Sequence, residues 1–188
     1  MDSLGNQNAG NASKPSGQDG GPSAEETFQW IQSHIDLGVP DMRGTSLKSV
    51  ELRDGKLTFL IEHVESDSQG AVVDLQSYTL DPADVTGEVE QSSSSLTIVT
   101  KPKKIKRTTI HSSWRGDWLW VDDEKVGNVL IAKVDQGAET ESRLKDGKGK
   151  HEMTSKCSFS VSEAKAERLK KAFDHLIQLH GGGKAEAF

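Results

Sequence analysis

This chain of 188 residues has only one cysteine, and it shows neither a long apolar run nor the pattern of a secretory leader. The single cysteine, Cys157, cannot form an internal disulfide, so nothing points to an oxidising compartment. No run of about 18 apolar residues is present, so no transmembrane segment is predicted. The opening MDSLG has neither the basic nor the apolar region of a signal peptide. We therefore expect a cytoplasmic protein, or an exported one if the N-terminus has been processed.

Apolar residues are also scarce in residues 1–22, where Gly, Asn, Ser, Gln and Pro dominate. Burial of so few apolar groups cannot offset the entropy lost on ordering. We expect a disordered tail over 1–22 and a flexible end over 181–188. The remaining residues suffice for one domain with one core.

A first helix is predicted over residues 23–38. Ser23 and Glu26 have the spacing of a capping box, and Gly38 with Pro40 ends the helix. One apolar face has the helical period, formed by Phe28, Ile31 and Ile35.

From residue 45 the apolar period changes to two, which is typical of strands. The turn RDG at 53–55 predicts a hairpin, with Leu47 and, after a slip in register, Val50 on the inner face. Residues 136–150 are predicted to be a polar loop. Strict alternation then predicts one further strand whose inward side carries Met153, Ser155, Cys157, Phe159 and Val161.

The last element is an amphipathic helix that begins at the N-cap Ser162 and ends at the run Gly181–Gly183. Its apolar stripe consists of Leu169, Ala172, Phe173, Leu176 and Ile177. No strand alternates with a helix, which excludes parallel βαβ folds and favours an α+β fold with a mostly antiparallel sheet.

Some seven antiparallel strands followed by one helix resemble the pleckstrin-homology-like (PH-like) superfold, over residues 45–180. The ending AERLKKAFDHLIQLHGG…AEAF is in addition similar to that of a group of uncharacterised bacterial proteins. The resemblance implies a curled sheet or partly open barrel capped by the C-terminal helix, with an additional N-terminal helix. It also implies a module that binds phosphoinositides, peptides or partner proteins.

Basic residues are absent between Lys56 and Lys101, and then KPKKIKR places five cations in seven positions. This run is either a charged hairpin tip that keeps the protein soluble or a patch for anionic groups. The candidate binding residues are Lys101, Lys103, Lys104, Lys106 and Arg107. The net charge of −6 argues against specific nucleic-acid binding.

The segment HSSWRGDWLW holds three of the four tryptophans. Either Trp118 and Trp120 form a core wall against the C-terminal helix, or they form an exposed platform; Gly116 could turn Trp114 away from both. The Arg-Gly-Asp triplet is attributed to chance.

No catalytic constellation, metal site or cofactor motif is predicted, because the six histidines are scattered and Cys157 reads as a buried thiol. We expect a non-enzymatic binding module for a protein partner or an anionic ligand. Two alternatives stay open. One is a small-molecule carrier or enzyme with a cavity lined by Trp120, Phe159 and Phe173, and the other is a structural subunit of a larger assembly.

Overall fold

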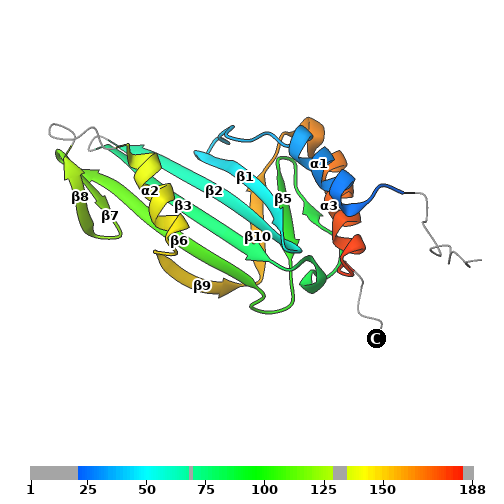
Figure 1. The fold of residues 1–188 in the computed structure, drawn as a ribbon. Helices are drawn as coiled ribbons and strands as arrows, with labels where there is room; N and C mark the ends of the chain where they lie inside the picture. Colours follow the sequence, from blue (N-terminus) through cyan, green and yellow to red (C-terminus); the bar gives the residue numbers. More distant parts are fainter. Residues whose placement is uncertain (1–20, 68–69, 129–134, 184–188) are drawn as a thin grey trace, which may run out of the picture.

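The computed structural model describes residues 21–67, 70–128 and 135–183. This part of the chain forms an α+β fold of two antiparallel sheets with three α-helices (Figure 1). The helices are α1 (Ala24–His34), α2 (Gln136–Lys145) and α3 (Glu163–Leu179), with one short 3-10 helix, η1 (Pro82–Asp84). The strands are β1 (Thr45–Arg53), β2 (Lys56–Asp67), β3 (Gly70–Leu80), β4 (Glu90–Gln91), β5 (Ser95–Val99), β6 (Ile105–Arg115), β7 (Trp118–Val121), β8 (Glu124–Asn128), β9 (Lys150–Thr154) and β10 (Lys156–Ser160). The predicted α+β class with a mostly antiparallel sheet is confirmed.

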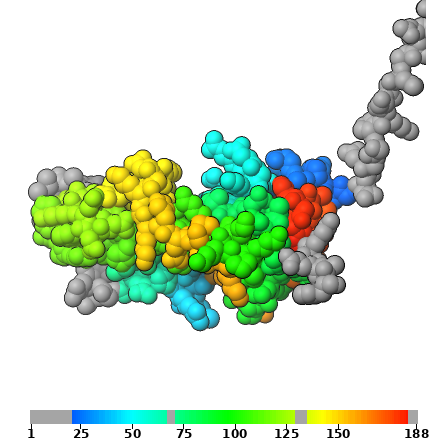
Figure 2. Space-filling view, turned by 90° about the horizontal axis from the view of Figure 1, so that it is seen from below, coloured from blue at the N-terminus to red at the C-terminus, as the bar shows by residue number. Residues whose placement is uncertain are grey.

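The long sheet has the strand order β1-β2-β3-β6-β7-β8, with β9 also paired to β6, and the second sheet has the order β10-β5-β4. The described strands make no pairing that closes the two sheets into a barrel. In a view turned by 90°, β7, β8 and α2 lie at one end of an elongated molecule, and α1 and α3 lie at the other (Figure 2).

Helix α1 begins with the predicted capping box. The backbone N–H of Glu26 donates to Ser23 Oγ at 3.2 Å, and the backbone N–H of Ser23 donates to Glu26 Oε2 at 2.8 Å. Phe28 and Ile31 are buried against the core, as their spacing predicted. The predicted slip in β1 is also present, because its register with β2 shifts between Leu47 and Ser49.

The larger core lies between the long sheet, the second sheet and the helix pair α1–α3. Alternate residues of β2 point into it, namely Leu57, Phe59 and Ile61. The predicted stripe of α3 is confirmed, with Leu169, Phe173, Leu176 and Ile177 buried in the same core and Ala172 packed against it. A smaller core on the opposite face of the long sheet consists of Ile110, Leu119 and Val121 under α2.

The glycine run stops α3 as predicted. Gly181 has a φ of +86°, and the backbone N–H of Gly182 donates to Ile177 O at 3.0 Å, which is the pattern of a Schellman motif. A Cβ built on Gly182 would lie 1.9 Å from Pro82 O, so only glycine allows the end of α3 to approach η1 this closely.

The prediction of a polar loop over 136–150 is wrong in its first part, because residues 136–145 form α2. Asp135 Oδ1 caps this helix by accepting from the backbone N–H groups of Gly137 and Ala138. Thr140 is buried, donates to Gln136 O at 2.6 Å, and has its hydroxyl 3.1 Å from Ser112 Oγ on β6. The helix is held partly by such polar contacts, and for that reason the apolar period did not reveal it.

The predicted single strand over 153–161 is two strands in different sheets. β9 pairs with β6 and β10 pairs with β5. Cys157 and Phe159 are buried as predicted, but Met153 is 51% exposed. The alternation of the sequence continues across the point at which the chain changes sheet, so the pattern gave no sign of the break.

The prediction that Trp118 and Trp120 form a wall against the C-terminal helix is wrong. Both are half-buried on β7. The residues that alternate with them, Leu119 and Val121, point into the smaller core. Lys125 Nζ lies 3.1 Å from the centre of the Trp118 ring, and the Arg115 guanidinium carbon lies 5.0 Å from the centre of the Trp120 ring. Gly116, with a φ of +63°, reverses the chain between β6 and β7.

Candidate functional site

The basic run of the sequence lies at the connection between β5 and β6. Lys101, Lys103 and Lys104 are exposed in this connection, and Lys106 is exposed at the start of β6. The backbone N–H of Lys101 donates to Asp84 O, and that of Lys103 donates to Ser155 Oγ, both at 3.0 Å. The backbone that carries the lysines is therefore tied to two neighbouring segments.

Arg107 is separated from these lysines because successive residues of a strand point to opposite faces. It forms an ion pair with Glu152, and the Tyr78 hydroxyl donates to Gln76 Oε1 at 2.6 Å. The neighbouring Tyr78 side chain raises the pKa of Arg107, and burial raises the pKa of Tyr78. Arg107 thus joins β6 to β3 and β9 instead of adding to an exposed patch.

A third lysine, Lys56, lies in the same cleft as Lys104 and Lys106 although it is far from them in the sequence. Lys56 begins β2, and Thr79 of β3 is paired with Thr58 of β2 on one side and with Lys106 of β6 on the other. These elements surround a cleft of about 300 Å³. Its lining defines the basic cleft: Lys56, Thr79, Leu80, Asp81, Asp84, Lys104 and Lys106.

The basic cleft contains three lysines and two aspartates, which gives it a formal net charge of +1, and only Lys104 of the three forms an ion pair. Lys104 Nζ lies 3.7 Å from Asp84 Oδ2, while Asp81 Oδ1 accepts from the backbone N–H of Ala83 and caps η1. Lys56 and Lys106 make no ion pair with any residue that the structure describes, and neither do Lys101 and Lys103 beside the cleft. An incoming anion would therefore meet free ammonium groups.

Lys56 is the residue of this cleft that sequence reasoning left out of the site. It follows the hairpin turn between β1 and β2, and nothing in the local sequence links it to residues 101–107. Only the strand order places it in the site, since the order β2-β3-β6 brings the first residues of β2 close to the first residues of β6 across the end of β3.

The three residues expected to line a carrier cavity, Trp120, Phe159 and Phe173, do not surround a common cavity. Phe159 and Phe173 pack together with ring centroids 5.5 Å apart, and both are at most 2% exposed. Trp120 lies on β7, at the other end of the long sheet (Figure 1).

Other chemistry in the described residues is sparse. Burial raises the pKa of the Cys157 thiol far above its usual range, so this sulfur is protonated at neutral pH. Within residues 21–67, 70–128 and 135–183, no three or more His, Cys, Asp or Glu side chains are grouped to hold a metal ion. Of the helices in the same ranges, none is long and apolar enough to cross a bilayer.

In comparisons with known proteins, no protein-family model, no curated protein and no solved structure matches this chain.

Proposed function

We propose that this protein is a non-enzymatic binding module that takes up an anionic group, such as a phosphate, in the basic cleft. One observation carries the proposal. Lysines from the starts of β2 and β6 and from the β5–β6 connection line one cleft, and Lys56 and Lys106 have no acidic partner among the described residues.

A phosphate suits this arrangement because its charge attracts several ammonium groups, each of which acts as a point charge with three donors. The Thr79 hydroxyl, which shares a hydrogen bond of 3.1 Å with Thr58, adds a neutral polar group to the lining. Binding through exposed lysines is screened by salt and falls as ionic strength rises. We therefore expect moderate affinity with a strong dependence on salt.

The same proposal includes a PH-like scaffold. Two features support it: α3 directly follows β10, the last strand, and it packs on the core between the two sheets. The order of the strands differs from a simple consecutive run, because the chain forms β4 and β5 of the second sheet before β6 joins the long sheet.

The test is a titration of the 15N-labelled full chain with inositol 1,4,5-trisphosphate, followed by amide NMR at low and raised salt. We expect shifts centred on the backbone of Lys56 and residues 101–106. The double variant Lys56→Gln/Lys106→Gln removes two charges without breaking an ion pair, and it should weaken binding about tenfold or more.

The matched control is Lys125→Gln/Lys148→Gln, which removes the same charge at the end of the molecule near α2 and β8. It should bind as the wild type does. Equal losses in both double variants, or shifts that avoid the cleft altogether, would show that only the net charge of the chain matters and would overturn the proposal.

A further inference from the structure

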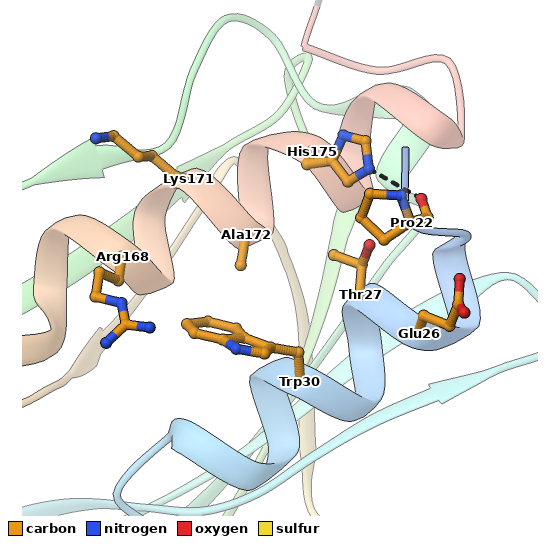
Figure 3. Close-up of a pocket in the computed structure, with 8 residues that line it drawn as sticks. All are labelled: Pro22, Glu26, Thr27, Trp30, Arg168, Lys171, Ala172 and His175. Carbon is orange, nitrogen blue, oxygen red and sulfur yellow. Dashed lines mark hydrogen bonds between the residues drawn. The ribbon is translucent and has the colours of Figure 1, made fainter. Parts of the chain in front are cut away.

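A second recess lies between α1 and α3. It shares no lining residue with the basic cleft. It is a groove of about 600 Å³ (Figure 3). Its lining defines the helix groove: Pro22, Glu26, Thr27, Trp30, Arg168, Lys171, Ala172 and His175. Because Pro22, Glu26, Arg168 and Lys171 are exposed, the groove is shallow and open to solvent.

The floor of the helix groove is apolar and ordered. Trp30 is half-buried, and its ring stacks on His34 with centroids 4.0 Å apart and 14° between the planes. Thr27 is buried beside it on α1, and the methyl group of Ala172 points toward Trp30 from α3 (Figure 3). Because alanine is the smallest side chain at a helix face, Ala172 leaves room for an apolar side chain from outside.

The rim of the groove carries two cations, Arg168 and Lys171. The Arg168 guanidinium carbon lies 5.4 Å from the centre of the Trp30 ring, and Arg168 makes no hydrogen bond or ion pair with any described residue. Lys171 pairs only with Glu167 on its own helix, and both side chains are 72% exposed, so this pair contributes little.

The one carboxylate of the lining, Glu26, is ionised and turned toward Ser23. Glu26 Oε2 accepts from the backbone N–H and the hydroxyl of Ser23, and the bond from the backbone N–H is the main cause that lowers the pKa of Glu26. At the far end of the groove His175 Nε2 makes a hydrogen bond of 3.1 Å with Pro22 O, which ties the start of α1 to α3. Arg168 therefore presents a free planar fork of donors that matches a carboxylate.

We propose that the helix groove is the docking site for an acidic amphipathic helix of a partner protein. From Arg168 to His175 the groove follows about two helical turns, the length over which a docked helix presents residues i, i+3, i+4 and i+7. Apolar residues of that helix fill the space over Trp30 and Ala172, and a Glu or Asp beside them takes Arg168 as a bidentate partner. A small free carboxylate fits less well, because an open groove leaves much of such a ligand in water.

The test uses the full-length protein, immobilised, and a displayed library of helix-forming peptides of about 14 residues, a length that spans the groove with one further turn on each side. We expect enrichment of peptides with apolar residues at i, i+4 and i+7 and with acidic residues beside them. Binding of one enriched peptide is then measured by fluorescence polarisation. Arg168→Gln should weaken it about tenfold, since a charge-assisted bidentate pair is lost.

Two further variants make the result specific. Ala172→Leu fills the floor and should abolish binding, while far-ultraviolet circular dichroism and thermal unfolding check that α3 is intact. Lys56→Gln/Lys106→Gln, which removes two of the three lysine charges of the basic cleft, should leave peptide binding unchanged. The two proposed sites can therefore be tested independently of each other.

Several outcomes overturn the proposal. The first is that the library shows no enrichment, and the second is that basic sequences are enriched. The third is that the enriched peptides bind the variants Arg168→Gln and Ala172→Leu with the affinity of the wild type. Displacement of the peptide by hexanoate alone would assign the groove to a small carboxylate. Self-association of the full chain that Arg168→Gln removes, seen by sedimentation, would assign it to a second copy.

Discussion

Phe59 of β2 and Phe159 of β10 stack across the two sheets, with ring centroids 4.8 Å apart and 22° between the ring planes. Phe173 of α3 meets the edge of Phe159 at 5.5 Å. All three side chains are at most 2% exposed. One aromatic cluster thus joins the long sheet, the second sheet and the C-terminal helix.

Truncation of this cluster should be severe. Phe159→Ala removes a buried ring and leaves a cavity between the two sheets and α3, so we expect a loss of about 3–5 kcal/mol in the free energy of unfolding. Urea denaturation followed by circular dichroism measures it. Met153→Ala, at an exposed position of β9, should stay within about 0.5 kcal/mol of the wild type; similar losses in both would contradict the prediction.

Gly182→Ala should destabilise the end of α3. The added methyl group would lie 1.9 Å from Pro82 O, so η1 or the helix end has to move. We expect a loss of about 1–3 kcal/mol, as for other overpacked sites. Gly137→Ala is the control, since its Cβ meets only Asp135 Oδ1 at 3.4 Å; it should be neutral or slightly stabilising in thermal unfolding.

Cys157 should make the protein less stable in alkaline solution. Its pKa is raised by burial in the folded state, whereas the unfolded thiol loses its proton above about pH 8.5. The folded state then binds more protons than the unfolded state, so the free energy of unfolding falls by up to about 1.4 kcal/mol per pH unit above that value. Unfolding curves between neutral and alkaline pH measure this slope. In Cys157→Ala the contribution of the thiol to this slope should be absent. A slope equal to that of the wild type would refute the assignment of the alkaline destabilisation to Cys157.

Thr140→Val should loosen α2. The variant keeps the shape of the side chain but removes a buried hydroxyl that donates to Gln136 O at 2.6 Å and lies 3.1 Å from Ser112 Oγ, at a cost of about 1 kcal/mol. Amide hydrogen exchange should quicken in residues 136–145 and stay the same in α3. Thr97→Val, which removes an exposed hydroxyl near Ser158, serves as the comparison; faster exchange of α2 in that variant as well would argue against a specific role for Thr140.

The helices at the two ends of the fold could be predicted because their signals are local. The capping box of Ser23 and the stripe through Leu169 and Phe173 each lie within one helix. Helix α2 escaped prediction because only Leu144 gives it a clear apolar contact, while Thr140 and its cap Asp135 make polar ones. The cap of Asp135 is a local signal that the sequence analysis missed, whereas the contact between Thr140 and Ser112 depends on the tertiary structure and leaves no period in the sequence.

The candidate site was predicted only in part for a similar reason. The run of cations marked residues 101–107 as a group, but the alternation of β6 splits that group between Lys106 and Arg107. Lys56 joins the cleft through pairing across β3, which a single sequence does not reveal. The tryptophans were misplaced because their spacing fixes which residues share a face and says nothing of what covers that face.

Strand β6 contributes a buried side chain to each of the two cores. Its Ile105 is buried in the larger core and its Ile110 in the smaller one, and the odd spacing puts the two side chains on opposite faces of the sheet. A slip of β6 by one residue against β3 would exchange inside and outside along the whole strand and expose both isoleucines at once. A misaligned pairing of this strand would therefore lose the native burial of both isoleucines, so the two cores at opposite ends of the protein favour the same register.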